Sequence, residues 1–293
     1  YSLPPEFIAQ KPCDPRDSSR LLILQRASGS IEHAAFRDLG SYLNAGDLLV
    51  LNQTRVIPAR IFGRKATGGR VEVLLLKRED ALTWEVLVGG KRLLTGMVLI
   101  FDEGPSAQII EELTGSRRRI HFSEPIEPFL DSIGHVPLPP YIHEKLSDPE
   151  RYQTIYAQES GSAAAPTAGL HFTQPLLRSL QEKGIELAKV ILHVGLDTFA
   201  PVTEENPSEH TIHTEWCELP PATVKAIQNT RQLGNKVIAV GTTTVRTIES
   251  GGRDGELTPY QGNTNLFILP GYQFKFVDAM ITNFHLPKST LIM

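Results

Sequence analysis

The sequence has few cysteines, few aromatic residues and no long apolar run. Only Cys13 and Cys217 occur among 293 residues, far apart and outside the spacings of disulfide scaffolds or four-cysteine zinc sites. The first residues lack the basic segment and apolar core of a signal peptide, and no apolar run is long enough to span a bilayer. These absences favour a cytoplasmic protein in a reducing compartment, with no membrane contact.

The chain also lacks an excess of either charge. Its formal net charge is −4, so no general basic field attracts the whole molecule to a polyanion, and a nucleic-acid partner would need a local basic patch. With 41% apolar residues, the chain has material for a sizeable core and a length that permits two domains. The apolar run Leu291–Met293 predicts that further core-forming residues follow it.

The region 60–124 has a β pattern. Short apolar runs rich in Val and Ile are separated by glycine-containing turns, which is typical of antiparallel strands. The runs are Val71–Leu76, Trp84–Val88, Val98–Phe101, Ala107–Ile110 and Arg119–Phe122. We therefore expect residues 60–124 to form a small inserted antiparallel β-barrel domain.

The flanking regions, 1–59 and 125–293, alternate strands and helices. Apolar runs at Leu48–Leu51, Ile185–Val194 and Lys236–Val240 predict buried strands. Helices are predicted from Thr173 to Gly184 and from Val224 to Leu233, each followed by a glycine stop. This alternation indicates a discontinuous α/β domain, mostly parallel and of α/β/α type.

The predicted strand before Gly241 runs directly into three threonines, Thr242, Thr243 and Thr244, and then into a helix that contains Arg246. Such a junction offers backbone N–H groups and hydroxyls to a carboxylate, phosphate or ribose. The alternative is that the threonines only cap the helix.

Two histidine motifs lie at element boundaries. Small residues from Ser162 onward precede His171 and would let a ligand approach the backbone, while an imidazole exchanges protons near neutral pH. His193 opens the segment His193–Phe199 at a strand end, where ligands bind in open α/β sheets. A lone histidine before a helix is nevertheless more often structural.

The run Glu209–Cys217 is the one place where a metal is arguable. His210, His213 and Cys217 are ligand types that zinc accepts, so a zinc hydrolase is one rival interpretation. Their spacing does not match a helical metal motif, and the run looks like a solvated segment. We therefore expect no metal.

Arginines and lysines gather in and beside the predicted barrel. The positions are Arg55, Arg60, Arg64, Lys65, Arg70, Lys91, Arg92 and Arg117–Arg119. On a closed barrel they would converge into a strip that follows a phosphate backbone, or they are ordinary solvated strand faces. The first alternative leads to a second rival function, a noncatalytic RNA-binding module.

Taken together, these segments resemble one family along nearly the whole chain, the queuosine-pathway S-adenosylmethionine:tRNA ribosyltransferase-isomerases. The matching strings are Tyr1–Gln10, Arg16–Leu21, Gly46–Asn52, Thr54–Arg60, Pro137–Ile142, Ser162–Thr173, His193–Phe199, His210 with His213, Val240–Glu249, Phe267–Tyr272 and Thr282–Ser289. The family carries a further C-terminal stretch after the residues that correspond to Leu291–Met293.

The resemblance implies an α/β domain with an inserted β-barrel and an unusual use of S-adenosylmethionine, in which the ribosyl part is transferred. The acceptor is 7-aminomethyl-7-deazaguanine at the wobble position of tRNA, the product is epoxyqueuosine, and adenine and methionine leave. S-adenosylmethionine is a cosubstrate, and no prosthetic group is expected. The partners are the anticodon loops of queuosine-type tRNAs, and we expect a monomer.

The chemistry of the family requires a base that removes a proton beside the sulfonium and a group that protonates departing adenine. The catalytic candidates, each within a family motif, are His171, His193, His213 and His285. The substrate-binding candidates are Asn52, Thr54, Arg55, Thr167, Gly169, Phe172, Gly195, Thr242, Thr243, Thr244, Arg246, Tyr272 and Asn283. Phe172 and Tyr272 are expected to stack on adenine or on the target base.

Overall fold

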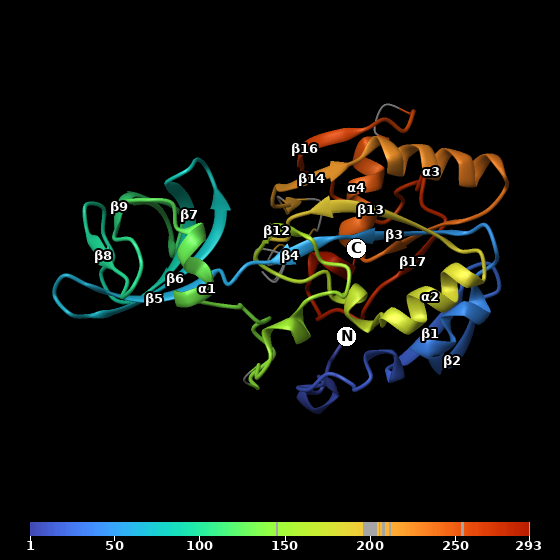
Figure 1. Ribbon diagram of the computed structural model, residues 1–293, viewed down its shortest axis with the longest axis horizontal. Coiled ribbons are helices and arrows are strands. Elements are labelled where there is room, and N and C mark those ends of the chain that lie inside the picture. The colour runs from blue at the N-terminus through green and yellow to red at the C-terminus, as the bar shows by residue number, and fades with distance from the viewer. Residues whose placement is uncertain are drawn as a thin grey trace. The chain divides into compact units, whose positions relative to one another are not determined.

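The computed structural model divides the chain into two compact units (Figure 1). It describes residues 1–144, 146–195, 204, 206, 209–210, 212–252 and 255–292. The α/β unit comprises Tyr1–Arg55, Pro140–Glu159 and Ala165–Met293, and the barrel unit comprises Val56–Pro139 and Ser160–Ala164. The chain passes between them within the short strands β4 (Thr54–Val56) and β12 (Glu159–Ser162) and near Pro140.

The barrel unit is a closed ring of antiparallel strands. Its strands are β5 (Arg60–Lys65), β6 (Arg70–Arg78), β7 (Thr83–Gly89), β8 (Val98–Ile100), β9 (Ala107–Glu112) and β10 (Arg117–Phe122). The order is β5-β6-β7-β10-β9-β8, and pairing of β8 with β5 closes the ring. Inward residues such as Val73, Ile109 and Ile120 are fully buried, as the alternation along each strand requires.

The barrel unit is wider than the expected 60–124. Strand β11 (Gly134–His135) pairs with β5, so that Gly134 lies opposite Ile61. Helix α1 (Leu130–Ile133) precedes it, and the side chain of Ile126 is fully buried. These residues belong with the barrel because their partners lie there, and a sequence pattern does not reveal strand partners.

The α/β unit contains a six-stranded sheet in the order β16-β14-β13-β3-β15-β17. Its strands are β3 (Leu48–Asn52), β13 (Glu186–Leu192), β14 (Glu215–Leu219), β15 (Val237–Val240), β16 (Tyr260–Thr264) and β17 (Ala279–Ile281). The pairs β13–β3, β3–β15 and β15–β17 are parallel, whereas β14 and β16 add an antiparallel edge. The predicted α/β class with an inserted antiparallel barrel is confirmed.

Helices cover both faces of this sheet (Figure 1). Leu49 and Leu51 of β3 share a core cluster with α2 (Gln174–Glu182). The alternate residues Leu48 and Val50 share the other cluster with α3 (Pro221–Gln232) and α4 (Thr242–Gly251). Burial on both faces explains the continuous apolar sequence of β3.

Local signals set the helix ends. The Thr173 hydroxyl accepts the N–H of Leu176 at the start of α2, and Gly184, with φ +88°, follows its end. The predicted helix from Thr173 to Gly184 is confirmed. No sequence pattern predicted the exposed hairpin of β1 (Arg20–Gln25) and β2 (Ser30–Ala35). Within the described residues, none of the helices has the length and hydropathy needed to cross a bilayer.

Candidate active site at the ends of the parallel strands

A cavity of about 390 Å³ opens where parallel strands end. Residues that follow β15 and β17, such as Thr242 and Thr282, line it, in the region where open α/β sheets bind ligands. Its lining residues are Tyr1, Ile212, His213, Glu215, Thr242, Thr243, Val245, Arg246, Leu266, Phe267, Ile268, Phe274, Met280, Thr282, Asn283, Phe284, His285, Thr290 and Leu291. Of the seventeen predicted site residues, the cavity brings six together: His213, His285, Thr242, Thr243, Arg246 and Asn283.

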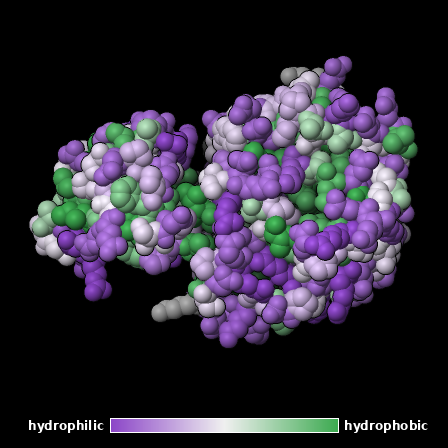
Figure 2. Space-filling model, viewed as in Figure 1, coloured by the Kyte–Doolittle hydropathy of each residue, from purple (hydrophilic) through white to green (hydrophobic). Residues whose placement is uncertain are grey.

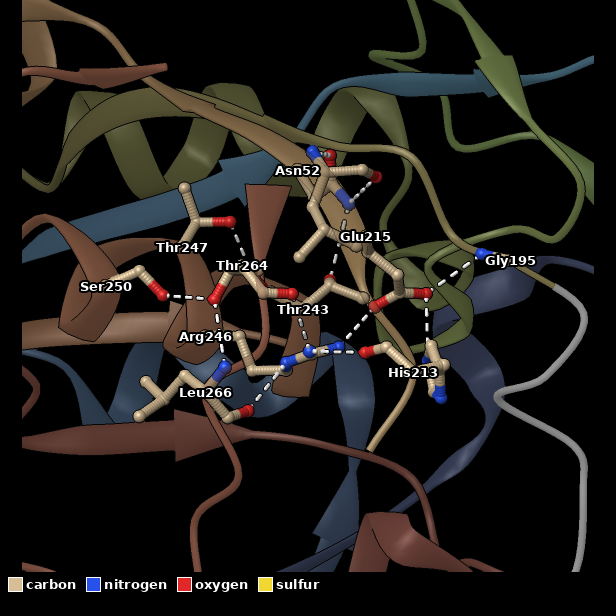
Figure 3. Close-up of polar contacts among 11 residues, drawn as sticks. Asn52, Gly195, His213, Glu215, Thr243, Arg246, Thr247, Ser250, Thr264 and Leu266 are labelled. Carbon is tan, nitrogen blue, oxygen red and sulfur yellow. Dashed lines mark hydrogen bonds and ion pairs between the residues drawn. The ribbon is translucent and has the colours of Figure 1, made fainter. Parts of the chain in front are cut away.

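A buried carboxylate organises one wall of the cavity (Figure 3). Glu215 Oε1 accepts the backbone N–H of Gly195 at 2.9 Å and lies 3.3 Å from His213 Nε2, while its Oε2 pairs with Arg246. Burial alone would raise the pKa of Glu215, but the bond from His213, the charge of Arg246 and the Gly195 N–H outweigh it and lower that pKa. Glu215 is therefore an ionised group held in one orientation.

Arg246 of α4 binds Glu215 and three carbonyl oxygens. Its Nε donates to Leu266 at 3.1 Å, and its Nη2 donates to both His213 and Thr264 at 3.3 Å (Figure 3). The guanidinium thus joins the helix to the segments on either side of it. Arg246 lies on the cavity wall, but most of its donors are used within the protein, and its binding of a substrate stays a prediction.

Asn52 lies at the end of β3 with a side chain only 1% exposed. Its amide donates to the Leu192 carbonyl at 3.0 Å and to Thr243 Oγ1 at 3.3 Å, and its oxygen accepts the N–H groups of Thr54 and Leu192, both at 3.1 Å. These four hydrogen bonds tie β3 to the end of β13 and to the start of α4. Asn52 shapes the site and presents no polar atom to a substrate.

The three threonines after Gly241 have different environments. Gly241 is the N-cap of α4, with φ +89°, and no side-chain hydrogen bond caps the helix there. Thr244 is fully buried and donates to the Val240 carbonyl at 2.7 Å, so it is structural. Thr242 and Thr243 line the cavity. The capping alternative is therefore wrong, and ligand binding by Thr242 and Thr243 stays a prediction.

His171 bridges two side chains. Its Nδ1 lies 2.9 Å from Ser19 Oγ, and its Nε2 lies 2.9 Å from Asn283 Oδ1. Burial lowers the pKa of His171, and the bond to Asn283 opposes that shift. Both ring nitrogens of His171 are thus engaged, and one of them binds Asn283, which lines the cavity.

His193 and His285 each use Nδ1 in a hydrogen bond, and the carbonyl partner of His285 also fixes its tautomer. His285 Nδ1 lies 2.8 Å from the Asn283 carbonyl and must donate to it, which leaves Nε2 with a lone pair. His193 Nδ1 lies 2.8 Å from the hydroxyl of fully buried Thr54, and its ring stacks on Trp216 at 5.2 Å. Burial lowers the pKa of both histidines, so both are neutral at pH 7.

The stacking role expected for Phe172 is wrong. This ring is fully buried in the core cluster, 5.0 Å from Phe36 and 6.3 Å from Tyr156. Gly169 is also buried, and a Cβ there would overlap the Tyr156 hydroxyl, so its small size serves packing. Thr167, in the same 3₁₀ turn, is half-buried and outside the cavity lining.

Tyr272 lies outside the cavity lining and supports a residue within it. Its hydroxyl donates to Glu249 Oε2 at 3.0 Å, and its ring meets Phe274 edge-on at 5.2 Å. Glu249, only 1% exposed, also accepts the backbone N–H groups of Lys275, Phe276 and Val277. The buried carboxylate thus fixes the loop that carries Phe274 to the cavity.

Six arginines of the barrel unit are paired with carboxylates. The ion pairs are Arg60–Glu72, Arg64–Asp102, Arg78–Glu127, Arg117–Glu85, Arg118–Glu112 and Arg119 with Glu79 and Glu111. Figure 2 shows hydrophilic and apolar residues interspersed on the visible face of this unit. These pairs agree with the alternative of ordinary solvated strand faces, and a strip that follows a phosphate backbone stays a prediction. In the α/β unit Arg55, another substrate-binding candidate, pairs with Glu150.

The run Glu209–Cys217 is not the solvated segment that its sequence suggests. Strand β14 begins at Glu215, and Glu215, Cys217 and Leu219 alternate inward between β13 and β16. His210 pairs with Glu204 at 2.9 Å. Among the residues that the structure describes, no three acidic, histidine or cysteine side chains are grouped as a metal site. The predicted motif residues Leu196–Phe199 lie outside the described residues.

The two buried carboxylates that hold the cavity wall and its loop, Glu215 and Glu249, were absent from the catalytic and substrate-binding candidates. The only sequence signal was an acidic residue at a position where strand or helix periodicity requires a buried side chain. A second hollow, of about 550 Å³, lies by α2, β13 and α3. Its ionisable lining residues are Lys189, which donates to Gln158 at 3.0 Å, and Tyr156, whose pKa is raised by burial, so the hollow offers little chemistry.

Comparison with known proteins agrees with this architecture. Residues 1–293 match the family described as "Queuosine biosynthesis protein". The chain is 52% identical over 299 residues to the S-adenosylmethionine:tRNA ribosyltransferase-isomerase of Symbiobacterium thermophilum, covering 100% of this chain and 88% of that protein. The relative of the same name from Moorella thermoacetica is 53% identical over 300 residues, with the same coverage.

A solved structure is similar as well. The crystal structure of S-adenosylmethionine tRNA ribosyltransferase from Thermotoga maritima superposes with a TM-score of 0.54 at 39% identity, covering 100% of this chain and 86% of that one. The family match spans every residue that lines the cavity, from Tyr1 to Leu291. The chain therefore belongs to the queuosine biosynthesis protein family.

Proposed function

We propose that this protein is an S-adenosylmethionine:tRNA ribosyltransferase-isomerase. It transfers and isomerises the ribosyl moiety of S-adenosylmethionine onto 7-aminomethyl-7-deazaguanine of tRNA, which gives epoxyqueuosine-tRNA and releases adenine and methionine. The observation that carries the proposal is the full-length similarity to relatives of that name at 51–53% identity. S-adenosylmethionine is consumed as a cosubstrate.

We place S-adenosylmethionine in the cavity at the strand ends. Its volume of about 390 Å³ falls within the range of small-molecule sites, roughly 300–1,000 Å³. Apolar and aromatic residues such as Phe267 and Phe274 form much of the lining, and Thr242, Thr243 and Glu215 are polar groups grouped within it. A mostly apolar wall with a few fixed polar groups is suited to a nucleoside that also carries an aliphatic chain.

His285 is the group that we assign to proton removal beside the sulfonium. It lines the cavity, its Nδ1–H is committed to the Asn283 carbonyl, and Nε2 therefore carries the lone pair. Because burial keeps the ring neutral at pH 7, that lone pair is available to accept a proton. Removal of this proton is followed by loss of adenine, by attack of the amine of the RNA base, and by closure of the epoxide with methionine as the leaving group.

His213 is the group that we assign to protonation of the departing adenine. It lines the same cavity, and Glu215 holds its ring from one side at 3.3 Å. The other two histidine candidates have supporting positions. His171 orients Asn283, and His193 packs on Trp216 beside the end of β13.

Product analysis tests the reaction. Purified protein is incubated with S-adenosylmethionine and a tRNA that carries 7-aminomethyl-7-deazaguanine, and the small molecules and the digested nucleosides are separated by chromatography and mass spectrometry. We expect one adenine and one methionine for each epoxyqueuosine formed. Binding of tRNA without adenine release would favour a noncatalytic RNA-binding module, and formation of S-adenosylhomocysteine would indicate methyl transfer instead.

Substitution of His285 tests the assignment of the base. His285→Gln keeps an N–H for the Asn283 carbonyl and removes the lone-pair nitrogen, so we expect kcat to fall by roughly 10²–10⁴-fold with little change in S-adenosylmethionine affinity. His171→Gln is the comparison, because it alters the support of Asn283 without removing the base. A His285→Gln enzyme with nearly normal kcat would move the base elsewhere.

We further propose that the RNA partner is the anticodon loop of tRNAs that carry this base, because the wobble nucleotide lies there, and that the protein acts as a monomer. An isolated anticodon stem-loop with the modified base is expected to support turnover. Sedimentation at working concentration is expected to give the mass of one chain. If turnover requires the whole tRNA, the anticodon loop is not a sufficient partner. If sedimentation gives the mass of a dimer, the protein is not a monomer.

A further inference from the structure

The loop that follows β17, residues 282–289, presents a phenylalanine to solvent at the edge of the cavity. Phe284 is 88% exposed, the highest exposure among the large hydrophobic side chains in the described part of the chain, yet it lines the cavity. An apolar ring in water is unfavourable unless a partner covers it. The ring of Phe284 is therefore placed to contact a binding partner at the edge of the cavity.

The backbone on both sides of Phe284 is fixed. Asn283 Oδ1 accepts a hydrogen bond from His171 Nε2 at 2.9 Å, and the Asn283 carbonyl accepts the Nδ1–H of His285 at 2.8 Å. Both neighbours of Phe284 are half-buried. The exposure of the ring is thus held by the fold and is not the result of a loose segment.

Two more exposed apolar side chains line the same cavity. Phe274 is 44% exposed and Met280 is 46% exposed. Tyr272 supports Phe274 from behind, and Glu249 binds both Tyr272 and the backbone that follows Phe274. This gives the cavity an aromatic rim that is held by buried groups.

A cation lies in the same loop. Lys288 is exposed, and its backbone has φ +60°, a conformation that is uncommon for residues other than glycine. No ion pair of Lys288 occurs among the described residues, in contrast with the paired arginines of the barrel unit. The loop therefore combines a flat apolar ring with an available positive charge, which matches the base and the phosphate of a nucleotide.

We infer that the loop 282–289 is an RNA-contacting segment, in which Phe284 stacks on the target base and Lys288 contacts a neighbouring phosphate. This inference rests on the proposed function, since a base that reacts inside a cavity must leave the stack of the RNA loop. An exposed ring at the rim receives such a base as it enters, whereas the small cosubstrate lies deeper in the cavity.

Substitution of Phe284 in the full chain tests the stacking contact. Binding of a fluorescent anticodon stem-loop is measured by anisotropy without S-adenosylmethionine, and KM values are measured for both substrates. For Phe284→Ala we expect RNA affinity to fall by roughly 5- to 150-fold, with the KM for S-adenosylmethionine and the Tm unchanged. Phe284→Tyr keeps the ring and is expected to restore binding.

Leu233→Ala is the matched control. Leu233 is 76% exposed, and it follows α3 at the edge of the sheet where β15 begins, away from the cavity. Its substitution is expected to leave RNA binding and turnover unchanged. If Phe284→Ala raises only the KM for S-adenosylmethionine, the ring contacts the cosubstrate and the inference is overturned, and unchanged values for both substrates overturn it as well.

The salt dependence of binding tests the contact of Lys288. Loss of one phosphate contact to a single-stranded segment is expected to reduce the slope of log K against log salt by about 0.7 for Lys288→Ala. An unchanged slope would remove the lysine from the interface. Because these binding measurements need no turnover, they separate a failure of this inference from a failure of the proposed reaction, which would appear as absence of adenine release by the unaltered protein.

Discussion

The two units use the same ion-pair chemistry with different exposure. In the barrel unit, the side chains of Arg64 and Asp102 are 48% and 76% exposed. At the strand ends of the α/β unit, those of Arg246 and Glu215 are 14% and 3% exposed. Water screens the first pair, which mainly leaves its surface neutral, whereas the second pair is shielded from water and fixes the cavity wall. Burial thus determines which charges shape the site.

The largest expected effect is at the buried pair. Glu215→Ala leaves Arg246 buried without its counter-charge, so we expect the free energy of unfolding to fall by about 3–5 kcal/mol. Urea unfolding followed by circular dichroism measures it. Glu215→Gln keeps the shape and one acceptor and is expected to lose less. An unchanged unfolding midpoint for the alanine variant would mean that the buried ion pair stabilises the protein no more than an exposed pair does.

Glu249→Ala is expected to have the next largest effect. The backbone N–H groups of Lys275, Phe276 and Val277 lose their acceptor, and each such group costs about 1–3 kcal/mol where water cannot reach it. Hydrogen exchange of these amides is expected to accelerate, together with a rise in the KM for S-adenosylmethionine because Phe274 loses its support. If exchange of the three amides stays as slow as in the unaltered protein, the carboxylate does not hold this loop.

Acidification is expected to destabilise the α/β unit more gradually. Burial lowers the pKa of His171, His193 and His285 below the ordinary 6.5, so the unfolded chain takes up protons first as the pH falls. Their contribution is complete above pH 6.5 and is lost as the pH falls toward their lowered pKa values. The lowered pKa of Glu215 acts in the same direction below 4.5. Tm values at pH 8, 7, 6 and 5 measure the trend, and a flat or rising Tm would contradict it.

The smallest effect is expected in the barrel unit. Arg64→Ala removes an exposed pair and is expected to change the free energy of unfolding by about 1 kcal/mol or less. The same variant measured at low and at high salt is expected to differ from the unaltered protein only at low salt. A loss as large as that of Glu215→Ala would show that exposure is a poor guide to the strength of these pairs.

Much of the fold could be predicted because it depends on local patterns. The apolar run of β3, the Thr173 cap and the position of Gly184 all act over a few residues. The location of the candidate site could also be predicted. Alternating strands and helices indicate a parallel sheet, and in such a sheet ligands bind beyond the carboxyl ends of the strands.

What could not be predicted depends on distant partners. Phe172 is buried against Phe36 and Tyr156, which no local pattern connects to it. Whether a barrel arginine has a carboxylate partner depends on strand register, which the sequence does not show. The family motifs made His171 and His285 equal catalytic candidates, but their hydrogen bonds differ. The burial of Glu215 could not be predicted, because the surrounding sequence looks solvent-exposed and its partner Arg246 belongs to another element.

The hydrogen bonds of Asn52 have a consequence for how the two sides of the site communicate. One amide, with every polar atom committed, connects the backbone that leads to His193 and Gly195 with the hydroxyl of Thr243 on the cavity wall. A ligand that draws Thr243 inward must therefore also move the end of β13 or break a bond in a place that water does not reach. The Asn52 amide thus ties the cavity wall at Thr243 to the strand end that leads to Gly195, whose N–H binds Glu215.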